Sequence, residues 1–166
     1  MNISNDLKMA MKEFAGSNYS RSIAYLDTVL QKEPENKLAL TTRGACFLRQ
    51  GDPEKAVADF NRAIAANPDN ARAYHLRGIA RTEQGDHPGA LADFNQAIAL
   101  DAGYGAAYNS RANLNSMLGR LTAAEKDAAM VSQLTLINIE SFANENNLLQ
   151  THHFSVEAAM ETDLNR

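Results

Sequence analysis

The stretch Asp59-Phe60-Asn61-Arg62-Ala63-Ile64 is followed 34 residues later by Asp93-Phe94-Asn95-Gln96-Ala97-Ile98. A second motif keeps the same interval, since Thr42-Arg43-Gly44-Ala45 is matched by Leu76-Arg77-Gly78-Ile79 and again by Ser110-Arg111-Ala112-Asn113. Agreement at several independent places indicates an internal repeat. A fixed period of this length is typical of arrays in which one small unit stacks on the next.

Three glycines fix the register of the repeat, because Gly51, Gly85 and Gly119 are also 34 residues apart. One further unit with the same spacing fits before the unit that contains Gly51. The four units lie end to end without an insertion and cover residues 3–36, 37–70, 71–104 and 105–138.

Each unit has the sequence pattern of two helices. In the second unit the pattern predicts a first helix over about 37–50, ended by Gly51, which tolerates the left-handed conformation found at helix ends. Asp52 is the expected cap of a second helix that runs to about Ala66. In the fourth unit the best available cap is Thr122.

Small residues recur where the two helices of a unit would cross. Gly44 is paired in this way with Ala56, and Gly78 with Ala90. Side chains of this size let two backbones approach closely. A single hairpin cannot bury its apolar face, so each unit needs its neighbour.

Composition supports a folded helical chain. Of the 166 residues 45% are hydrophobic, 22% are charged and only 7% are aromatic, and alanine is abundant. This mixture excludes a disordered polymer and favours closely packed helices over sheets. The one cysteine, Cys46, cannot form an internal disulfide, and the start of the sequence lacks the pattern of a signal peptide. We therefore expect a cytoplasmic protein.

Charge is distributed unevenly along the chain. Residues 1–138 hold 15 Lys or Arg and 15 Asp or Glu, whereas residues 139–166 hold five acidic residues and one arginine. A neutral body offers no electrostatic footprint for a phosphate backbone, so we expect no nucleic-acid partner. No apolar run approaches the roughly 20 residues of a membrane-spanning helix, so we expect no membrane partner either.

The repeat resembles the tetratricopeptide repeat family over residues 3–138. That family has a bulky fourth residue, a small eighth and twentieth residue, an aromatic residue at place 24 and alanine at place 27. This chain supplies these in the second and third units with Leu40 and Tyr74, Gly44 and Gly78, Ala56 and Ala90, Phe60 and Phe94, and Ala63 and Ala97. The fourth unit departs from the pattern, with Ala128 in place of the aromatic residue and Leu136 in place of the closing proline. The resemblance implies an all-α, right-handed superhelix, or helical solenoid, of four helix-turn-helix repeats.

Residues 139–166 lie outside the repeats. Leu136, Ile139, Phe142 and Leu149 follow a helical apolar spacing, and the fourth unit's outer face is expected to need cover. We predict a C-terminal capping helix followed by an acidic tail, with packing on a second copy as the alternative.

Signals of catalysis are absent from the sequence. It contains no phosphate-binding loop, no dinucleotide fingerprint and no His-Glu-x-x-His motif. The pair His152-His153 has no third histidine nearby, and Cys46 has no histidine at helical spacing. We therefore expect no enzyme, no cofactor and no metal site.

Two rows of charge recur once per unit. Arginine stands at Arg43, Arg77 and Arg111, and aspartate at Asp59, Asp93 and Asp127. The arginine row alone could bind a ligand. The matching aspartate row favours a structural ladder of ion pairs between helices.

The resemblance also implies that the first helices of successive units line a concave groove. Its lining places in this chain include Leu7, Met11, Phe14, Thr41, Leu48, Arg49, Arg72, His75, Ile79, Asn109 and Asn113. One branch of the family clamps the C-terminal carboxylate of heat-shock chaperones with Lys, Asn and Arg. In both possible frames this chain lacks those charges, because the places hold residues such as Leu7, Met11 and Leu76.

The predicted function is a non-catalytic protein–protein interaction module whose groove accepts a peptide or a partner helix. The alternative is a structural assembly module that self-associates through the fourth repeat and the C-terminal helix. In that case the partner is a second copy, giving a homodimer.

Overall fold

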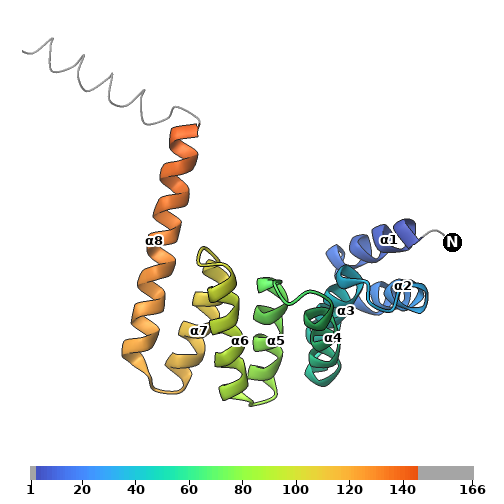
Figure 1. Ribbon diagram of the computed structural model, residues 1–166, viewed down its shortest axis with the longest axis horizontal. Coiled ribbons are helices and arrows are strands. Elements are labelled where there is room, and N and C mark those ends of the chain that lie inside the picture. Colours follow the sequence, from blue (N-terminus) through green and yellow to red (C-terminus); the bar gives the residue numbers. More distant parts are fainter. Residues whose placement is uncertain (1–2, 146–166) are drawn as a thin grey trace, which may run out of the picture.

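The computed structural model describes residues 3–145, and every secondary-structure element in that range is a helix (Figure 1). The helices are α1 (Ile3–Ala15), α2 (Tyr19–Lys32), α3 (Lys37–Arg49), α4 (Pro53–Ala66), α5 (Ala71–Glu83), α6 (His87–Leu100), α7 (Gly105–Met117) and α8 (Leu121–Glu145).

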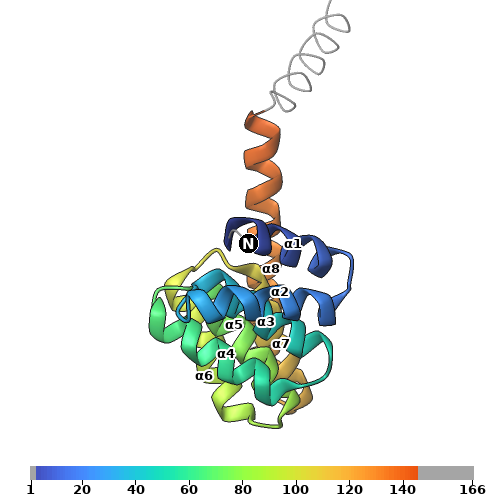
Figure 2. The same ribbon diagram turned by 90° about the vertical axis from the view of Figure 1, so that its right-hand side faces the viewer.

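The eight helices form four hairpins that stack in chain order. Each odd-numbered helix packs on the helix that follows it, and each even-numbered helix packs on the first helix of the next hairpin. Figure 1 shows this stack as a curved array with α1 and α8 at its two ends, and Figure 2 views it from the α1 end. The predicted all-α superhelix of four hairpins is confirmed.

Helix ends follow the sequence signals closely. The Asp52 carboxylate accepts a hydrogen bond from the Lys55 backbone N–H at 3.1 Å, as the predicted cap should. Gly51, Gly85 and Gly119 all have positive φ, and Ser17 occupies the equivalent place in the first unit with φ of 60°. The prediction for Thr122 is wrong, because α8 already begins at Leu121.

Glycine on the first helix makes room for a phenyl ring on the second. A Cβ added to Gly44 would lie 2.7 Å from Cε1 of Phe60, and one added to Gly78 would lie 2.5 Å from Cε1 of Phe94. Both rings are buried. The sequence therefore predicted correctly where the two helices of a unit cross. The space beside each glycine is filled by the phenyl ring of the second helix.

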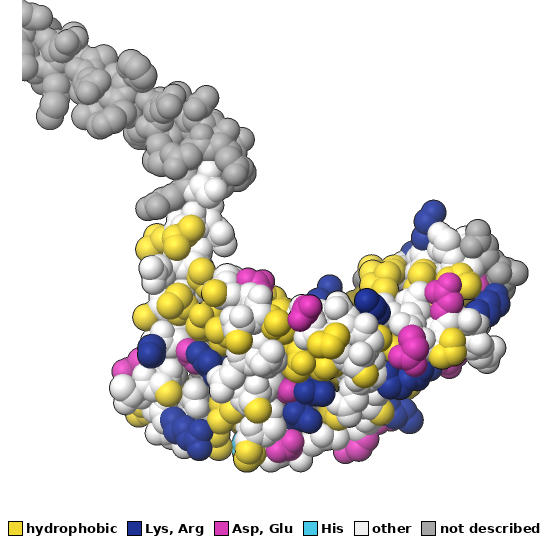
Figure 3. All heavy atoms as spheres, in the orientation of Figure 1, with side chains coloured by type: hydrophobic (Ala, Val, Ile, Leu, Met, Phe, Trp, Pro, Cys, Tyr) yellow, Lys and Arg dark blue, Asp and Glu magenta, His cyan; other side chains and the backbone are white. Residues whose placement is uncertain are grey.

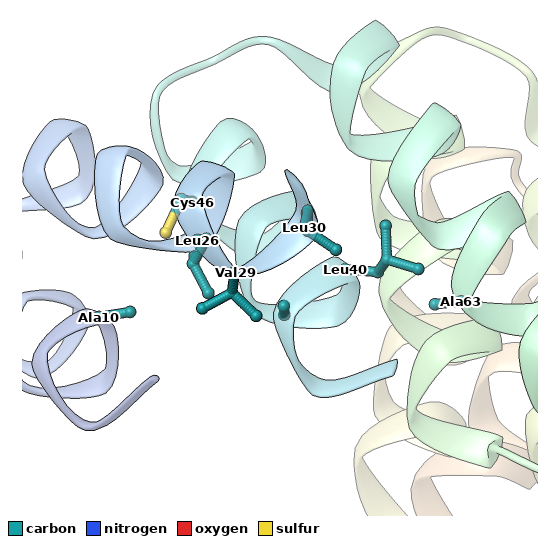
Figure 4. Close-up of a cluster of buried hydrophobic side chains, with 8 residues drawn as sticks. Ala10, Leu26, Val29, Leu30, Leu40, Cys46 and Ala63 are labelled. Atoms are coloured by element: carbon teal, nitrogen blue, oxygen red, sulfur yellow. The ribbon is translucent and has the colours of Figure 1, made fainter. Parts of the chain in front are cut away.

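The first two units share one apolar core. Figure 4 shows Leu26, Val29 and Leu30 of α2 between residues of α1, α3 and α4. Cys46 is buried in the same cluster, where burial raises the pKa of its thiol. In the first unit the helices cross as the sequence predicts, since the Ser22 hydroxyl donates to the Ala10 carbonyl at 2.9 Å.

The predicted ladder of charges forms in all three places. Arg77 donates through Nε and Nη2 to the two carboxylate oxygens of Asp93, at 2.9 and 2.6 Å. Arg43 makes the same two-pronged contact with Asp59, and Arg111 with Asp127. Hydrogen bonds to these carboxylates raise the pKa values of the Arg43 and Arg111 guanidinium groups. Bidentate pairs of this kind combine charge with fixed geometry.

Each arginine has a third contact that the sequence analysis did not anticipate. Nη1 of Arg77 donates at 2.7 Å to the side-chain oxygen of Asn61 on the preceding unit. Arg43 reaches Asp27 in the same way, and Arg111 reaches Asn95. One guanidinium thus joins both helices of its own unit to the unit before it.

The eighth helix is longer than its equivalents. It has 25 residues, whereas α2, α4 and α6 each have 14. Where α4 is followed by Asn67-Pro68-Asp69-Asn70, α8 continues through Thr135-Leu136-Ile137-Asn138, which contains no helix breaker. Residues 135–145, the projecting part of α8, therefore extend it away from the array (Figure 1). Residues 146–166, which include most of the predicted cap and tail, lie outside the described residues.

We expect Gly78→Ala to lower the free energy of unfolding by about 1–3 kcal/mol, because the new methyl group overlaps the Phe94 ring. The matched control is Gly105→Ala, whose Cβ would meet only Leu134 at 3.9 Å and should be neutral or slightly stabilising. Urea unfolding measures both. Equal stability of the two variants would contradict this account of the crossing.

We expect Arg77→Ala to cost about 1–3 kcal/mol of stability, since it removes the bidentate partner of the buried Asp93 carboxylate and leaves it only the hydrogen bond from Arg81 Nη1 at 2.9 Å. Lys55→Ala, which removes an exposed pair with Asp52, should change stability little. The same variants, assayed for a groove ligand, should keep their affinity. If Arg77→Ala lost ligand binding but kept its stability, the arginine row would be a ligand-binding surface and not a structural ladder.

Candidate functional site

The first helices of the units lie on the inner side of the array. Within residues 3–145, α1 contacts α3, α3 contacts α5 and α5 contacts α7, whereas the second helices do not contact one another. An array whose inner elements are closer together than its outer ones must curve around the inner set. The side chains that α1, α3, α5 and α7 direct inward therefore line a concave groove, which opens between α1 and α8 in Figure 3.

An apolar cavity occupies the N-terminal end of this groove. It has a volume of about 690 Å³, which is within the usual range of ligand pockets. Two residues predicted from the sequence, Leu7 and Met11, belong to its lining. The full lining comprises Ile3, Ser4, Leu7, Lys8, Met11, Glu33, Asn36 and Leu38. Met11 and Leu38 are strongly exposed for apolar residues, so this surface is open to a partner.

A second, smaller pocket lies between α5 and α7. Its volume is about 240 Å³, and it contains the predicted residues Ile79 and Asn113. Thr82, Glu83, Phe94, Ser110, Leu114 and Met117 complete its lining. Phe94, whose buried ring packs against Gly78, also forms part of this pocket. The pocket is mainly apolar, with an amide, a carboxylate and two hydroxyl groups among its lining residues.

Arg49, Arg72 and Asn109 are exposed, as a groove surface requires, but they line neither pocket. Arg49 and Arg72 provide positive charge on α3 and α5, between the two ends of the groove. Asn109 is four residues before Asn113 on α7, so the two amides share one helical face.

Three other predicted residues are turned into the protein. Phe14 packs edge-on against Tyr19, with ring centroids 5.8 Å apart. The Thr41 hydroxyl is buried and donates to the Lys37 carbonyl at 2.8 Å. Leu48 packs against the core cluster around Phe60. They support the groove from behind.

His75 is also buried, and both of its ring nitrogens are engaged within the chain. Nδ1 is 3.1 Å from the Tyr104 hydroxyl and Nε2 is 2.9 Å from the Ser110 hydroxyl. Its ring also meets the Tyr104 ring edge-on at 5.1 Å. His75 therefore links α5 to α7 and its cap, and it has no free nitrogen for a peptide backbone.

Burial lowers the pKa of His75 from its ordinary value of 6.5, and the positive charge of Arg72 acts in the same direction. A hydrogen bond with the backbone of Ala106 acts in the opposite direction but is outweighed. The side chain is accordingly neutral at pH 7, and it joins the two units without adding charge to the groove.

No group of three or more His, Cys, Asp or Glu side chains within residues 3–145 is arranged to hold a metal ion. In the same part of the chain, none of the helices has the length and apolar character needed to cross a bilayer. The pair His152-His153 lies outside the described residues.

Comparison with known proteins agrees with the geometry. A sequence profile described as Tetratricopeptide repeat matches residues 7–71, 47–104 and 75–131, which together span more than half of the chain. The chain belongs to the tetratricopeptide repeat family. No curated protein matches it closely enough in sequence to count as a relative.

Solved structures of other tetratricopeptide repeat proteins superpose on most of the array. A crystal structure of MamA aligns with a TM-score of 0.78 at 20% identity, covering 84% of this chain and 81% of that one. The first repeat domain of Spaghetti (RPAP3), bound to the HSP90 peptide SRMEEVD, aligns at 0.68 with 23% identity and coverages of 70% and 93%. The Arabidopsis OM64 domain aligns at 0.66 with 22% identity and coverages of 69% and 94%. At these identities the likeness concerns the fold alone.

We expect this tetratricopeptide array to lose stability as the pH falls below 6.5, because the unfolded chain takes up a proton at His75 more readily than the folded chain does. The stabilising effect of the neutral ring is complete above that value and disappears as pH falls through the lowered pKa. Urea unfolding at several pH values should show a shallower dependence for His75→Gln than for the wild type. Parallel curves for the two proteins would contradict this role.

Proposed function

We propose that this protein is a non-catalytic interaction module that binds a peptide or a partner helix in its concave groove. The observation that carries the proposal is the pair of apolar-lined hollows on the inner helices, one between α1 and α3 and one between α5 and α7. A ligand that places an apolar side chain in each hollow must lie along the groove between them.

The two hollows would supply most of the binding energy. Apolar anchors in well-packed pockets usually dominate such interfaces, while polar contacts fix register. Leu7 and Met11 would hold one anchor, and Ile79 would hold the other. Asn109 and Asn113 would donate to and accept from the ligand's backbone, as side-chain amides can.

Charge suggests what lies between the anchors. Arg49 and Arg72 are exposed on α3 and α5, and His75 is neutral. Arg49 ends α3 and Arg72 is near the start of α5, so the ligand would need a separate acidic group for each arginine. Glu83, in the second pocket, would disfavour an acidic group at that end.

The proposed ligand differs from the HSP90 peptide that Spaghetti (RPAP3) carries in its solved structure. The carboxylate clamp known from one branch of the family needs Lys, Asn and Arg at places where this chain has Leu7, Met11 and Leu76. We therefore propose recognition through apolar anchors. The buried, unpaired Cys46 supports action in a reducing compartment such as the cytoplasm.

Self-association is the second candidate function. The observation that favours it is the exposure of three apolar residues, Leu136, Ile137 and Ile139, on the part of α8 that extends beyond the array. A group of exposed apolar residues often marks a site of interaction with another protein.

We expect the double variant Asn109→Ala, Asn113→Ala to weaken a peptide selected from a random library on the wild-type protein by about 1–3 kcal/mol. This is the usual cost of leaving buried polar groups of a bound ligand unpaired. Isothermal titration calorimetry measures the affinity. Gln96→Ala, an exposed amide on α6, is the matched control and should bind like the wild type.

Normal binding by the double asparagine variant would remove that end of the groove from the proposal. Met11→Ala tests the other end separately, since Met11 is exposed in the cavity and its loss should weaken the same peptide. A selected peptide that ignores both changes binds elsewhere, and the groove assignment would then be wrong.

A further inference from the structure

The last unit of the array ends in a polar face. Asn61 and Asn95 receive the arginine of the unit that follows them, and the equivalent place in the fourth unit is Ala129. Beside it, Glu125 and Ser132 replace residues that are apolar in the earlier units, and both are exposed. A polar outer face is typical of a terminal repeat. Within the described residues, the outer side of the fourth unit therefore resembles that of a terminal repeat.

The unpartnered apolar surface lies instead on the projecting part of α8. The side chains of Leu136, Ile137 and Ile139 are 60%, 51% and 59% exposed. Figure 3 shows hydrophobic side chains on this part of the helix, above the body of the array. Nothing in the described chain packs over them.

A second open apolar surface lies at the opposite end of the molecule. It is the N-terminal cavity of about 690 Å³, in which Met11 is 43% exposed and Leu38 is 50% exposed. The cavity is concave and the projecting surface is convex, so the two are of opposite shape.

The two surfaces cannot meet within one molecule. α1 and α8 stand at the two ends of the stack in Figure 1, with α3 to α7 between them. Each surface is part of a helix that is packed into its own hairpin. Contact between them requires two copies of the chain.

Charge also favours this pairing. Residues 135–145 contain Glu140 and Glu145 and no Lys or Arg. Around the cavity, Lys8 belongs to the lining, and Lys12 and Lys37 are the exposed neighbours of Met11 and Leu38. Glu33 is the acidic residue in the lining. Complementary charge of this kind selects partners and orientation more than it adds affinity.

Pairing of two α8 helices with each other is the less favourable arrangement. Both copies of residues 135–145 carry a net negative charge, and like charges across an interface are costly.

We propose that the projecting part of α8 in one molecule docks into the N-terminal cavity of a second copy, head to tail. This rests on the proposed function, because the cavity is the apolar end of the same groove. The contact joins two different surfaces, so it is heterologous and leaves one of each surface open in every pair. It therefore extends to trimers and longer chains as concentration rises.

The test uses two variants of the full chain, each with two apolar residues of one surface replaced by glutamine. One carries Leu136→Gln and Ile139→Gln, and the other carries Met11→Gln and Leu38→Gln; all four residues are at least 43% exposed. Leu121→Gln, which removes an apolar residue at the α7–α8 turn, is the control. Melting curves confirm that each variant is folded, and sedimentation gives the mass across the micromolar to millimolar range.

The wild type and the control should rise in mass beyond a dimer, and each double variant alone should associate about tenfold more weakly or not at all. An equimolar mixture of the two double variants should form a 1:1 dimer that grows no further, because one intact contact remains. A mixture that stays monomeric would overturn the proposal, as would a wild type that is monomeric throughout. If that monomer still binds a selected peptide in a Met11-dependent way, the groove function stands and only the head-to-tail contact fails.

Discussion

Each of Arg43, Arg77 and Arg111 makes a two-sided contact, with an aspartate of its own unit and a side chain of the unit before it. This contact, the arginine fork, is the constraint on which the rest of the array depends. Arg77 binds the carboxylate of Asp93 with one side of its guanidinium and the amide oxygen of Asn61 with the other. It thereby sets the distance between the two helices of a unit and the position of that unit on the one before it. The planar group offers its donors in fixed directions, which a lysine could not do. Because the fork returns every 34 residues, the second, third and fourth units are each joined to the unit before them by the same arginine contact.

The fork also explains where the array stops. The first unit has Met9 and Tyr25 at the places of the arginine and aspartate, so it supplies only the Asp27 acceptor to the unit that follows. The fourth unit has its own pair but Ala129 in place of an acceptor, and Glu145 falls where a fifth arginine would stand. Charge pairing thus defines a beginning and an end, in agreement with the exposed polar residues on the outer side of α8.

The fold was predictable from the sequence because its signals repeat, and the site was less so because its contacts do not. The 34-residue period and the glycines predicted the helical hairpins, and the paired rows of arginine and aspartate predicted the ladder of ion pairs. The same periodicity placed Leu7, Met11, Ile79 and Asn113 on the inner face, and the structure brings them into two hollows. It could not show that His75 is buried, since its partners Tyr104 and Ser110 stand at places that hold other residue types, Asn70 and Leu76, in the preceding unit. α8 continues because residues 135–138 contain no helix breaker. The sequence analysis noted that Leu136 replaces the closing proline but did not infer a longer helix from it.

The local character of the contacts has a consequence for how the protein folds. The hydrogen bond from His75 to Ser110 joins residues 35 apart, and the arginine forks join residues only 16 apart. Contact order is therefore low, and no long loop has to close before a unit becomes stable. Such an array can open from one end while the remaining units stay folded. The N-terminal cavity is built from the first unit and the start of the second, so any ligand held there also holds α1 in place. Occupancy of that cavity and folding of the first unit are thus linked equilibria, and each raises the population of the other.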